Sequence, residues 1–255
     1  MSTQTIDAFH RDGFFLVQPA RGGHRAGMDA LALAAAVPTG FAGRIADLGA
    51  GAGAAGLAVA SRCPAASVVL VENSPDMAGY ARQSLELPEN ARLRGRVTVL
   101  EADVALAGKA RTAAGLADNS FDFAIMNPPF NAEIDRATPD DLRRQAHVME
   151  DGLFEAWLRT AAAIVRPRGG VAIIARPASL GPILATLAGR FGTAQIVPVH
   201  ARPDAPAIRI VLRATRGARG GLSIMPPLIL HETAGNGFSA RAEAINAGQA
   251  SLFGD

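Results

Sequence analysis

Cysteine, tryptophan, tyrosine and lysine each occur only once among the 255 residues of this sequence. A single thiol, Cys63, cannot form a disulfide within the chain, so a disulfide-stabilised fold is excluded and a reducing cytoplasm is the expected location. Aromatic residues make up only 5% of the chain, whereas apolar residues make up 49%. The core must therefore consist mainly of Ala, Val, Leu and Ile, in an amount sufficient for an α/β domain.

Long apolar runs are also missing. The longest uncharged stretches are short and rich in Gly and Ala, so we expect no membrane span and no membrane partner. Residues 1–12 show no signal-peptide pattern. The five histidines do not have the spacing of metal ligands, so no metal is expected.

Charge is nearly balanced overall, with a formal net charge of +2, but it is unevenly distributed. Residues 1–151 hold 14 basic residues against 18 acids, whereas residues 152–255 hold 11 Arg against 5 acids. A basic half suggests a polyanionic partner such as RNA. Scattered, solvated arginines in an Arg-rich sequence are the alternative explanation.

Short apolar runs alternate with helical patterns through the middle of the chain. The predicted strands are 44–48, 67–72, 96–101, 121–126, 171–175, 194–199 and 208–214. The predicted helices are 54–62, 75–85, 152–165 and 179–188. This alternation favours a doubly wound, mostly parallel α/β sheet of seven strands. The polar stretch 131–151, which contains Pro139, is predicted to be a long loop.

Two segments lie outside this alternation. Residues 1–40 are predicted to form an N-terminal extension, packed on a main domain of residues 41–255. Within the extension we expect a strand, a basic turn and a helix, at 14–17, 21–25 and 29–37. The tail is predicted to add a short strand and a short helix, at 228–230 and 240–247. Neither segment is long enough for a separate domain.

The segment from Ala46 to Gly56 reads Ala-Asp-Leu-Gly-Ala-Gly-Ala-Gly-Ala-Ala-Gly and joins a predicted strand to a helix. Glycines at such a junction let the backbone turn sharply and approach a ligand closely. Gly51, Gly53 and Gly56 also satisfy the dinucleotide-binding pattern, and Glu72 follows at the spacing of a ribose-binding acid. The glycines alone therefore leave NAD and S-adenosylmethionine open as cofactors.

Acidic residues favour S-adenosylmethionine. Asp47 ends its strand just before the glycines, where it would repel a diphosphate and attract a cofactor that carries an ammonium group. Asp103 follows the third strand, where it could reach the adenine amino group of a bound nucleoside. Together with Glu72, these acids close three successive strands at the edge where open α/β sheets bind ligands.

The tetrad Asn127-Pro128-Pro129-Phe130 ends the fourth predicted strand and is a stronger signal than the glycines. The Asn127 amide oxygen and the Pro128 carbonyl can accept both protons of a planar NH₂ group, and Phe130 can stack on the ring that carries it. Two such acceptors favour a pyramidal, attacking nitrogen and stabilise the positive charge that develops on it. We therefore predict the tetrad to be catalytic, with a proline-rich turn as the structural alternative.

The glycine motif and the acids resemble those of class I S-adenosylmethionine-dependent methyltransferases, which have a Rossmann-like fold, over about residues 44–214. The tetrad resembles that of amino-methyltransferases, whose targets are adenine N6, guanine N2 or glutamine amide nitrogen. In this family Glu72 would hold the ribose hydroxyls and Asp103 would meet the adenine amine. The cofactor-binding residues implied by the resemblance are Gly27, Asp29, Asp47, Gly49, Gly51, Gly53, Glu72, Asn73, Asp103, Val104 and Asn127.

The segment 18–31 resembles the N-terminal segment of the bacterial tRNA1(Val) adenine-37 N6-methyltransferase family, which leads into a helix across the cofactor pocket. The residues that match the family pattern are His24, Arg25, Gly27 and Asp29. Two departures concern the substrate side. Phe130 stands where the family usually has Tyr, and the stretch 131–151 has no clear counterpart.

The resemblance implies methyl transfer to an exocyclic amine, above all adenine N6 in tRNA or other structured RNA, and hence an RNA partner. A target base inside a paired helix would have to be flipped out. Arg209 and Arg213 lie an even number of residues apart on a predicted strand and should share a face. The predicted RNA-binding residues are Arg21, His24, Arg25, Arg143, Arg144, Arg209 and Arg213.

Other functions stay open from the sequence. A methyltransferase acting on a small molecule or on a protein glutamine would keep the same cofactor site. O-methylation would need a general base, for which His24 and His147 are the candidates. An NAD-dependent dehydrogenase would need a hydride acceptor site, and no such constellation is visible. A non-catalytic RNA-binding module is disfavoured by the intact set of Asp47, Glu72, Asp103 and Asn127.

Overall fold

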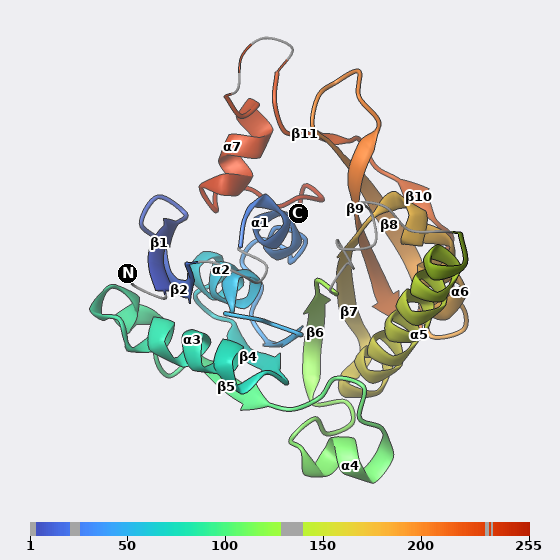
Figure 1. Cartoon of the computed structure of the whole chain (residues 1–255), viewed down its shortest axis with the longest axis horizontal. Helices are drawn as coiled ribbons and strands as arrows, with labels where there is room; N and C mark the ends of the chain where they lie inside the picture. Colours follow the sequence, from blue (N-terminus) through green and yellow to red (C-terminus); the bar gives the residue numbers. More distant parts are fainter. Residues whose placement is uncertain (1–3, 21–25, 129–139, 233–234, 236) are drawn as a thin grey trace.

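The computed structural model describes residues 4–20, 26–128, 140–232, 235 and 237–255. Within these residues a nine-stranded sheet has the order β10-β8-β9-β7-β6-β3-β4-β5, with β11 paired to β8 (Figure 1). Its strands are β3 (Arg44–Leu48), β4 (Ser67–Glu72), β5 (Val97–Glu101), β6 (Phe121–Met126), β7 (Val165–Ala175), β8 (Phe191–His200), β9 (Ala207–Arg216), β10 (Ser223–Ile224) and β11 (Leu228–Ile229). The helices are α1 (Met28–Ala34), α2 (Ala54–Arg62), α3 (Pro75–Glu86), α4 (Gly108–Ala113), α5 (Asp140–Ile164), α6 (Leu180–Leu187) and α7 (Ala240–Asn246).

The predicted doubly wound α/β class is confirmed. Strands β5, β4, β3, β6 and β7 run parallel, whereas β9 runs antiparallel between β7 and β8. The seven predicted strands form the body of the sheet. The two-residue strands β10 and β11 pair with the outer edge of β8 and account for the difference from seven.

Helices cover both faces of the sheet, and alternate residues of each strand supply the two cores. Ile45 of β3 and Leu70 of β4 pack in the cluster beneath α1, α2 and α3. Their neighbours Ala46 and Val71 belong to the opposite cluster, beneath α5 and α6. Strands buried on both faces read as continuous apolar runs, which is why their positions could be predicted. No helix among the described residues is long and apolar enough to span a membrane.

Helix α5 begins at Asp140, so the prediction of a loop as far as residue 151 is wrong. The stretch from Asp140 to Asp151 contains neither Gly nor Pro, but its polar, charged composition hid the helical pattern. The other end also differs from the prediction. The helix stops at Ile164 and β7 starts at Val165, so that Pro167 lies inside a strand.

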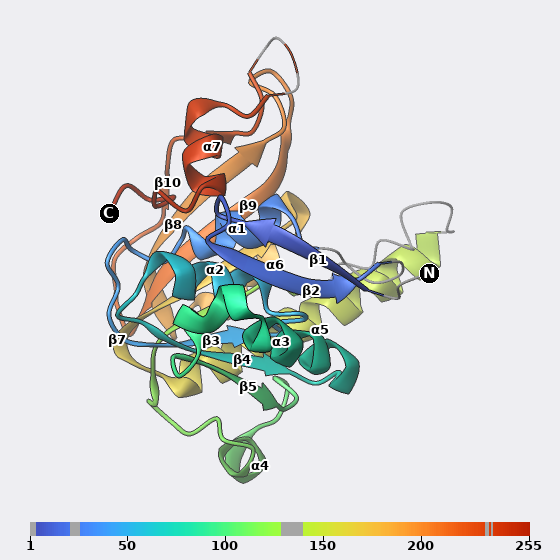
Figure 2. The ribbon, with the colours of Figure 1, turned by 90° about the vertical axis from the view of Figure 1, so that its left-hand side faces the viewer.

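An antiparallel hairpin of β1 (Gln4–Phe9) and β2 (Phe14–Pro19) precedes the sheet. Strand β1 was not predicted, because none of its residues is buried and pairing with β2 alone specifies it. Strand β2 is fixed against α3 and the following 3₁₀ turn (Figure 2). The Phe15 N–H donates to Asn90 Oδ1 at 2.9 Å, and the Val17 N–H donates to Ser84 Oγ at 2.8 Å. Side chains thus satisfy the outer edge of β2.

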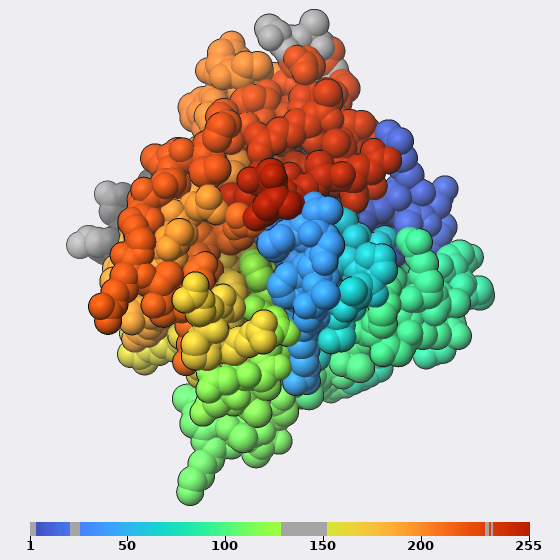
Figure 3. Space-filling view, turned by 180° about the vertical axis from the view of Figure 1, so that it is seen from behind, coloured from blue at the N-terminus to red at the C-terminus, as the bar shows by residue number. Residues whose placement is uncertain are grey.

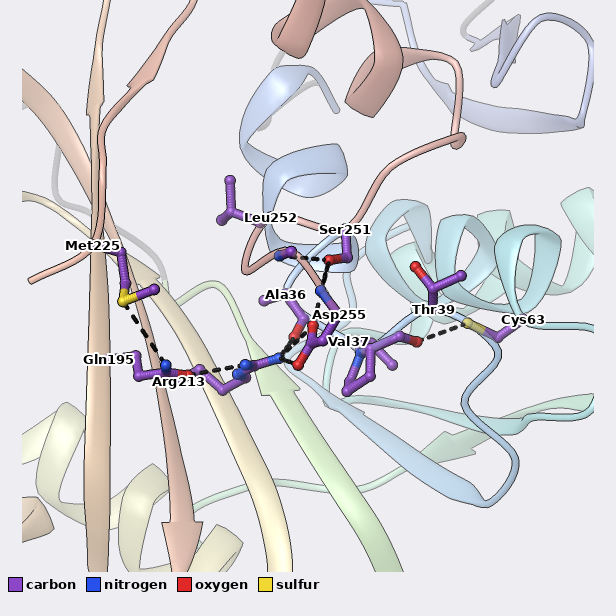
Figure 4. A network of polar contacts seen from close by, with 12 residues as sticks. Ala36, Val37, Thr39, Cys63, Gln195, Arg213, Met225, Ser251, Leu252 and Asp255 are labelled. Atoms are coloured by element: carbon purple, nitrogen blue, oxygen red, sulfur yellow. Dashed lines mark hydrogen bonds and ion pairs between the residues drawn. The ribbon is translucent and has the colours of Figure 1, made fainter. Parts of the chain in front are cut away.

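The last residues of the chain lie against the segment that follows α1 (Figure 3). The Leu252 N–H donates to the Ala35 carbonyl at 2.6 Å, and the Thr39 N–H donates to the Asp255 carbonyl at 3.0 Å. Arg213 of β9 completes this network through an ion pair with Asp255 at 2.7 Å (Figure 4). The contacts join the C-terminal residues and the segment after α1 to the sheet.

Candidate active site

The glycine motif forms a tight loop between β3 and α2. Gly49, Gly51 and Gly53 have φ angles of +71°, +58° and +95°, which side-chain-bearing residues rarely adopt. The N–H groups of Gly49 and Ala50 both donate to the Val71 carbonyl, at 2.9 and 3.0 Å. These two hydrogen bonds hold the loop at the carboxyl end of β4. The positive φ angles require glycine at the three positions.

Gly49 has a second reason to be glycine. A Cβ atom at this position would lie 2.1 Å from Cη2 of Trp157. Trp157 belongs to α5, more than 100 residues later in the sequence. The indole ring is 8% exposed and covers the start of the glycine loop. Helix α5 can pack this closely only because residue 49 has no side chain.

A cavity of about 640 Å³ opens over this loop, within the size range of small-molecule sites. Most of the predicted cofactor residues line it. These are Gly27, Asp47, Gly49, Gly51, Glu72, Asn73, Asp103, Val104 and Asn127. The cavity thus brings together the ends of β3, β4, β5 and β6, as expected for the carboxyl edge of such a sheet.

Asp47 is the most buried acid of the site, at 2% exposed. Its Oδ2 accepts a hydrogen bond of 2.8 Å from the Gly56 N–H in the first turn of α2. Burial raises the pKa of Asp47 to about 7; the Gly56 hydrogen bond opposes this shift and the nearby charge of Glu72 adds to it. A cationic group in the cavity would favour the ionised form of this acid.

Glu72 accepts two backbone hydrogen bonds at one side of the cavity. Its Oε2 accepts from the Gly51 N–H at 2.7 Å, and its Oε1 accepts from the Ser74 N–H at 2.8 Å. One carboxylate thus connects the glycine loop to the start of α3. Asp103, after β5, is exposed, and its Oδ1 accepts from the Ala105 N–H at 2.8 Å.

Asn127 and Pro128 lie at the same cavity, one step beyond the end of β6. Strand β6 pairs with β3 on one side and with β7 on the other, so Asn127 stands at the middle of the sheet edge. Asn127 is half-buried and Pro128 is buried. Pro129 and Phe130, the other predicted catalytic residues, lie outside the described residues.

Two predicted cofactor residues do not line the cavity. Gly53 packs inward, and a Cβ atom there would lie 2.8 Å from Leu70 Cδ1, so its absent side chain serves the contact of α2 with the sheet. Asp29 forms an ion pair of 2.8 Å with Arg209, which does line the cavity. The contact of Gly53 and Asp29 with the cofactor therefore stays a prediction, and these contacts place both residues behind the cavity wall.

The predicted RNA-binding residues have different outcomes. Arg209 and Arg213 do share a face of β9, but Arg213 is engaged internally with Asp255 and with Gln195, whose Oε1 accepts at 2.9 Å (Figure 4). We therefore assign Arg213 a structural role. Arg21, His24 and Arg25, and the side chains of Arg143 and Arg144 in the first turns of α5, lie outside the described residues.

Besides seven alanines, the cavity lining contains residues with larger side chains that sequence reasoning missed. They are Gln18, Met77, Leu153, Trp157 and Arg176. Leu153 and Trp157 are four residues apart on α5 and so face the same way, and the second is the only tryptophan of the chain. The spacing of Leu153 and Trp157 was the one sequence signal that could have found these residues. Gln18, Met77 and Arg176 come from segments whose neighbours depend on the order of the strands in the sheet.

These residues fit the cofactor that the sequence predicts. The glycine loop leaves its backbone open to the cavity, and buried carboxylates on the same side suit a ligand with cationic groups. Among the described residues, no cluster of His, Cys, Asp or Glu is arranged to hold a metal ion. The fold and the site together define an S-adenosylmethionine-dependent methyltransferase of class I.

Comparison with known proteins gives the family. The family model of the methyltransferase small domain matches residues 27–201, and the chain belongs to this family. The tRNA1(Val) (adenine(37)-N6)-methyltransferase of Serratia proteamaculans is 30% identical over 229 residues, which cover 85% of this chain and 82% of that protein. The enzyme of the same name from Yersinia pestis is 28% identical over 224 residues, 87% of this chain and 85% of that one.

Solved structures agree with this assignment. A predicted O-methyltransferase from Agrobacterium tumefaciens is 45% identical, with a TM-score of 0.77 and coverage of 88% of this chain and 98% of that one. The 16S rRNA N2 G1207 methyltransferase of T. thermophilus, solved with AdoMet and guanosine, has the same fold. It is 22% identical with a TM-score of 0.55, and the match covers 83% of this chain and 50% of that one.

Proposed function

We propose that this methyltransferase modifies an exocyclic amine, and that its target is adenine N6 in tRNA or another structured RNA. One observation carries the proposal. Asn127 and Pro128 line the cavity that the glycine loop lines, so amine acceptors and cofactor site share one space. The relatives named as tRNA adenine-N6-methyltransferases support the choice of base.

The reaction needs little from the protein besides binding and orientation. S-adenosylmethionine supplies a methyl group on a sulfonium, which makes the leaving group good. The glycine loop, Asp47, Glu72 and Asp103 hold the cofactor at the carboxyl ends of β3, β4 and β5. The Asn127 side-chain oxygen and the Pro128 carbonyl accept the two amine protons, orient the nitrogen lone pair, and stabilise the positive charge that develops on nitrogen.

Methylation of a hydroxyl is the main rival, in view of the similar protein from Agrobacterium tumefaciens. A hydroxyl must lose its proton to a general base before or during transfer. Among the described residues no histidine lines the cavity, and the carboxylates of Asp47 and Glu72 accept hydrogen bonds from backbone N–H groups of the glycine loop and the neighbouring helices. His24 and the side chain of His147, the candidate bases for O-methylation, lie outside the described residues. An amine loses its proton after transfer and needs no such base.

Nucleoside analysis tests the proposal. The protein is incubated with labelled S-adenosylmethionine and tRNA from cells that lack the modification, and the RNA is then digested to nucleosides. We expect the label in N6-methyladenosine. Label in a ribose-methylated nucleoside would replace the proposal with O-methylation, and transfer to a small molecule or a peptide, with none to RNA, would overturn it. A tRNA substrate also agrees with the cytoplasmic location expected from the single cysteine.

A further inference from the structure

Gln18 is a buried polar side chain in the wall of the cavity. It lies near the end of β2, is 1% exposed, and lines the cavity together with Ala26 and Gly27. A buried amide is costly unless its N–H and C=O groups have hydrogen-bond partners. The partners of Gln18 therefore show which segments are held together at this wall.

The amide of Gln18 joins two other segments of the chain. Its Nε2 donates to Asp7 Oδ2 of β1 at 2.6 Å, and its Oε1 accepts from the Ala26 N–H at 2.9 Å. Gln18 pairs with Thr5 in the hairpin, and Asp7 lies two residues further along the same face of β1. The Thr5 Oγ1 also donates to Asp7 Oδ2, at 2.8 Å. The hairpin thus fixes the Gln18 amide, and the amide fixes the backbone at Ala26.

Gly27 follows Ala26 and is the N-cap residue of α1, at the cavity wall. Its φ angle of −156° is open to any residue, and a Cβ atom there would meet no atom of the described residues within 4 Å. Neither the backbone conformation nor these packing contacts require a glycine at this position. The missing side chain leaves the space in front of the wall free for a ligand.

We infer that Gln18 is a positioning residue for cofactor binding, which fixes Ala26 and Gly27 as the wall against which S-adenosylmethionine lies. The hydrogen bond from the Ala26 N–H is the contact that transmits this effect. The inference concerns the cofactor cavity alone, so it is independent of the group that receives the methyl. Its test needs a bound cofactor product and no methyl acceptor.

A purely structural role of Gln18 in the hairpin is the alternative, and Ser84 provides a matched case. Ser84 is buried and accepts from the Val17 N–H of the same strand at 2.8 Å. It is not among the described residues that line the cavity. Removal of either acceptor should lower the temperature of unfolding, whereas only removal of Gln18 should weaken cofactor binding.

The experiment measures affinity for S-adenosylhomocysteine by calorimetry and folding by thermal unfolding. Gln18→Met keeps the approximate length of the side chain and removes both hydrogen bonds. A lost hydrogen bond at the wall should weaken binding about 2- to 10-fold. Ser84→Ala should bind as tightly as the wild type, although it unfolds at a lower temperature.

A paired exchange separates positioning from a general loss of stability. In Asp7→Asn/Gln18→Glu the amide and the carboxylate change places, so a hydrogen bond between positions 7 and 18 is kept with its direction reversed. The carboxylate at position 18 still offers an oxygen to the Ala26 N–H. Binding should therefore recover from the level of Gln18→Met toward the wild type. Asp7→Asn alone is measured as well, so that its own effect can be subtracted.

Gly27→Ser tests the wall directly and does not depend on the folding of Gln18→Met. Serine suits the N-cap position of α1, so the temperature of unfolding should not fall. Its side chain would enter the space that the inference gives to the cofactor. We expect binding of S-adenosylhomocysteine to weaken by about 10-fold or more.

Three results would overturn the inference: wild-type affinity in Gln18→Met or in Gly27→Ser, an equal loss of affinity in Ser84→Ala and Gln18→Met, or no recovery in a double variant that unfolds like the wild type. If Gln18→Met does not fold, Gly27→Ser decides. If the expected pattern of binding is found but RNA is not methylated, the proposed function fails and this inference stands.

Discussion

The two ends of the cavity are built differently. At one end, three acids and a glycine loop follow β3, β4 and β5, and backbone N–H groups occupy both buried carboxylates. At the other end, Arg176, which follows β7, and Arg209 of β9 line the cavity, and Arg209 forms an ion pair with Asp29. The acidic end comes from three successive strands within residues 44–104, whereas the basic end is assembled from residues far apart in the sequence.

This difference matches the uneven charge of the chain. The acidic first part of the sequence supplies the strands of the acidic end, and the basic second part supplies β7 and β9. Of the arginines in the basic part of the chain, Arg176 and Arg209 line the cavity. Arg213, on the same face of β9, contributes to the C-terminal network instead. Charge alone could not distinguish Arg209, at the cavity, from Arg213, in the C-terminal network.

The strongest test of this division is Asn127→Ala, since Asn127 stands between the two ends. Removing one of two acceptors from a site preorganised for developing charge should lower methyl transfer about 100- to 1,000-fold. Cofactor affinity, measured by calorimetry, should stay close to that of the wild type. Asn73→Ala is the matched control at the acidic end, where we expect weaker cofactor binding and a nearly normal rate at saturating cofactor. Efficient transfer by Asn127→Ala would remove the amine-binding role.

Gly49→Ala should disrupt the glycine loop at the acidic end of the cavity. The added Cβ would meet Trp157 at 2.1 Å in a backbone conformation with φ +71°. Overpacking and backbone strain together should lower the free energy of unfolding by about 3 kcal/mol, as measured by chemical denaturation. Gly221→Ala is the control, because nothing lies within 4 Å of its Cβ position and its φ is not in the left-handed region. A loss as small as that of the control would mean that Trp157 does not pack on the loop.

Asp47→Asn tests the burial of the acidic end through the pH dependence of stability. The pKa of Asp47 is raised from 3.8 to about 7 in the folded state, chiefly by burial. Between about pH 4 and pH 7 the folded state keeps a proton that the unfolded state has released, so wild-type stability is lost as pH rises. The loss is on the order of 1 kcal/mol per pH unit.

The neutral variant lacks this dependence. The difference in unfolding free energy should therefore shift in favour of Asp47→Asn as pH rises from about 4 to about 7, and then level off. Asp204→Asn changes an exposed loop acid and serves as the control. Parallel stability curves for Asp47→Asn and the wild type would show that Asp47 is ionised throughout.

The smallest expected effect is optical. Trp157 is the only tryptophan of the chain, and it lines the cavity against Gly49. Binding of S-adenosylhomocysteine should change its emission, because a ligand replaces water beside the ring. An emission that does not change while calorimetry shows binding would mean that the ligand does not reach Trp157.

The sequence by itself determined the fold class, most of the strand boundaries and the acidic end of the cavity. Strands β3, β4 and β6 begin and end where predicted, because strands buried on both faces are uninterrupted apolar runs. The glycine loop and the acids Asp47, Glu72 and Asp103 could be found because each follows its own strand directly. Their positions at one edge then follow from parallel strand direction.

Only the tertiary structure decided the rest of the site. Arg209 pairs with Asp29 at a separation of 180 residues, and Trp157 covers Gly49 from a helix whose first half reads as a polar loop. Arg176 reaches the cavity because it follows β7, which lies parallel beside β6. Such contacts depend on strand order and register, which no local pattern encodes. Composition and spacing thus define each element, whereas packing selects which of their side chains meet.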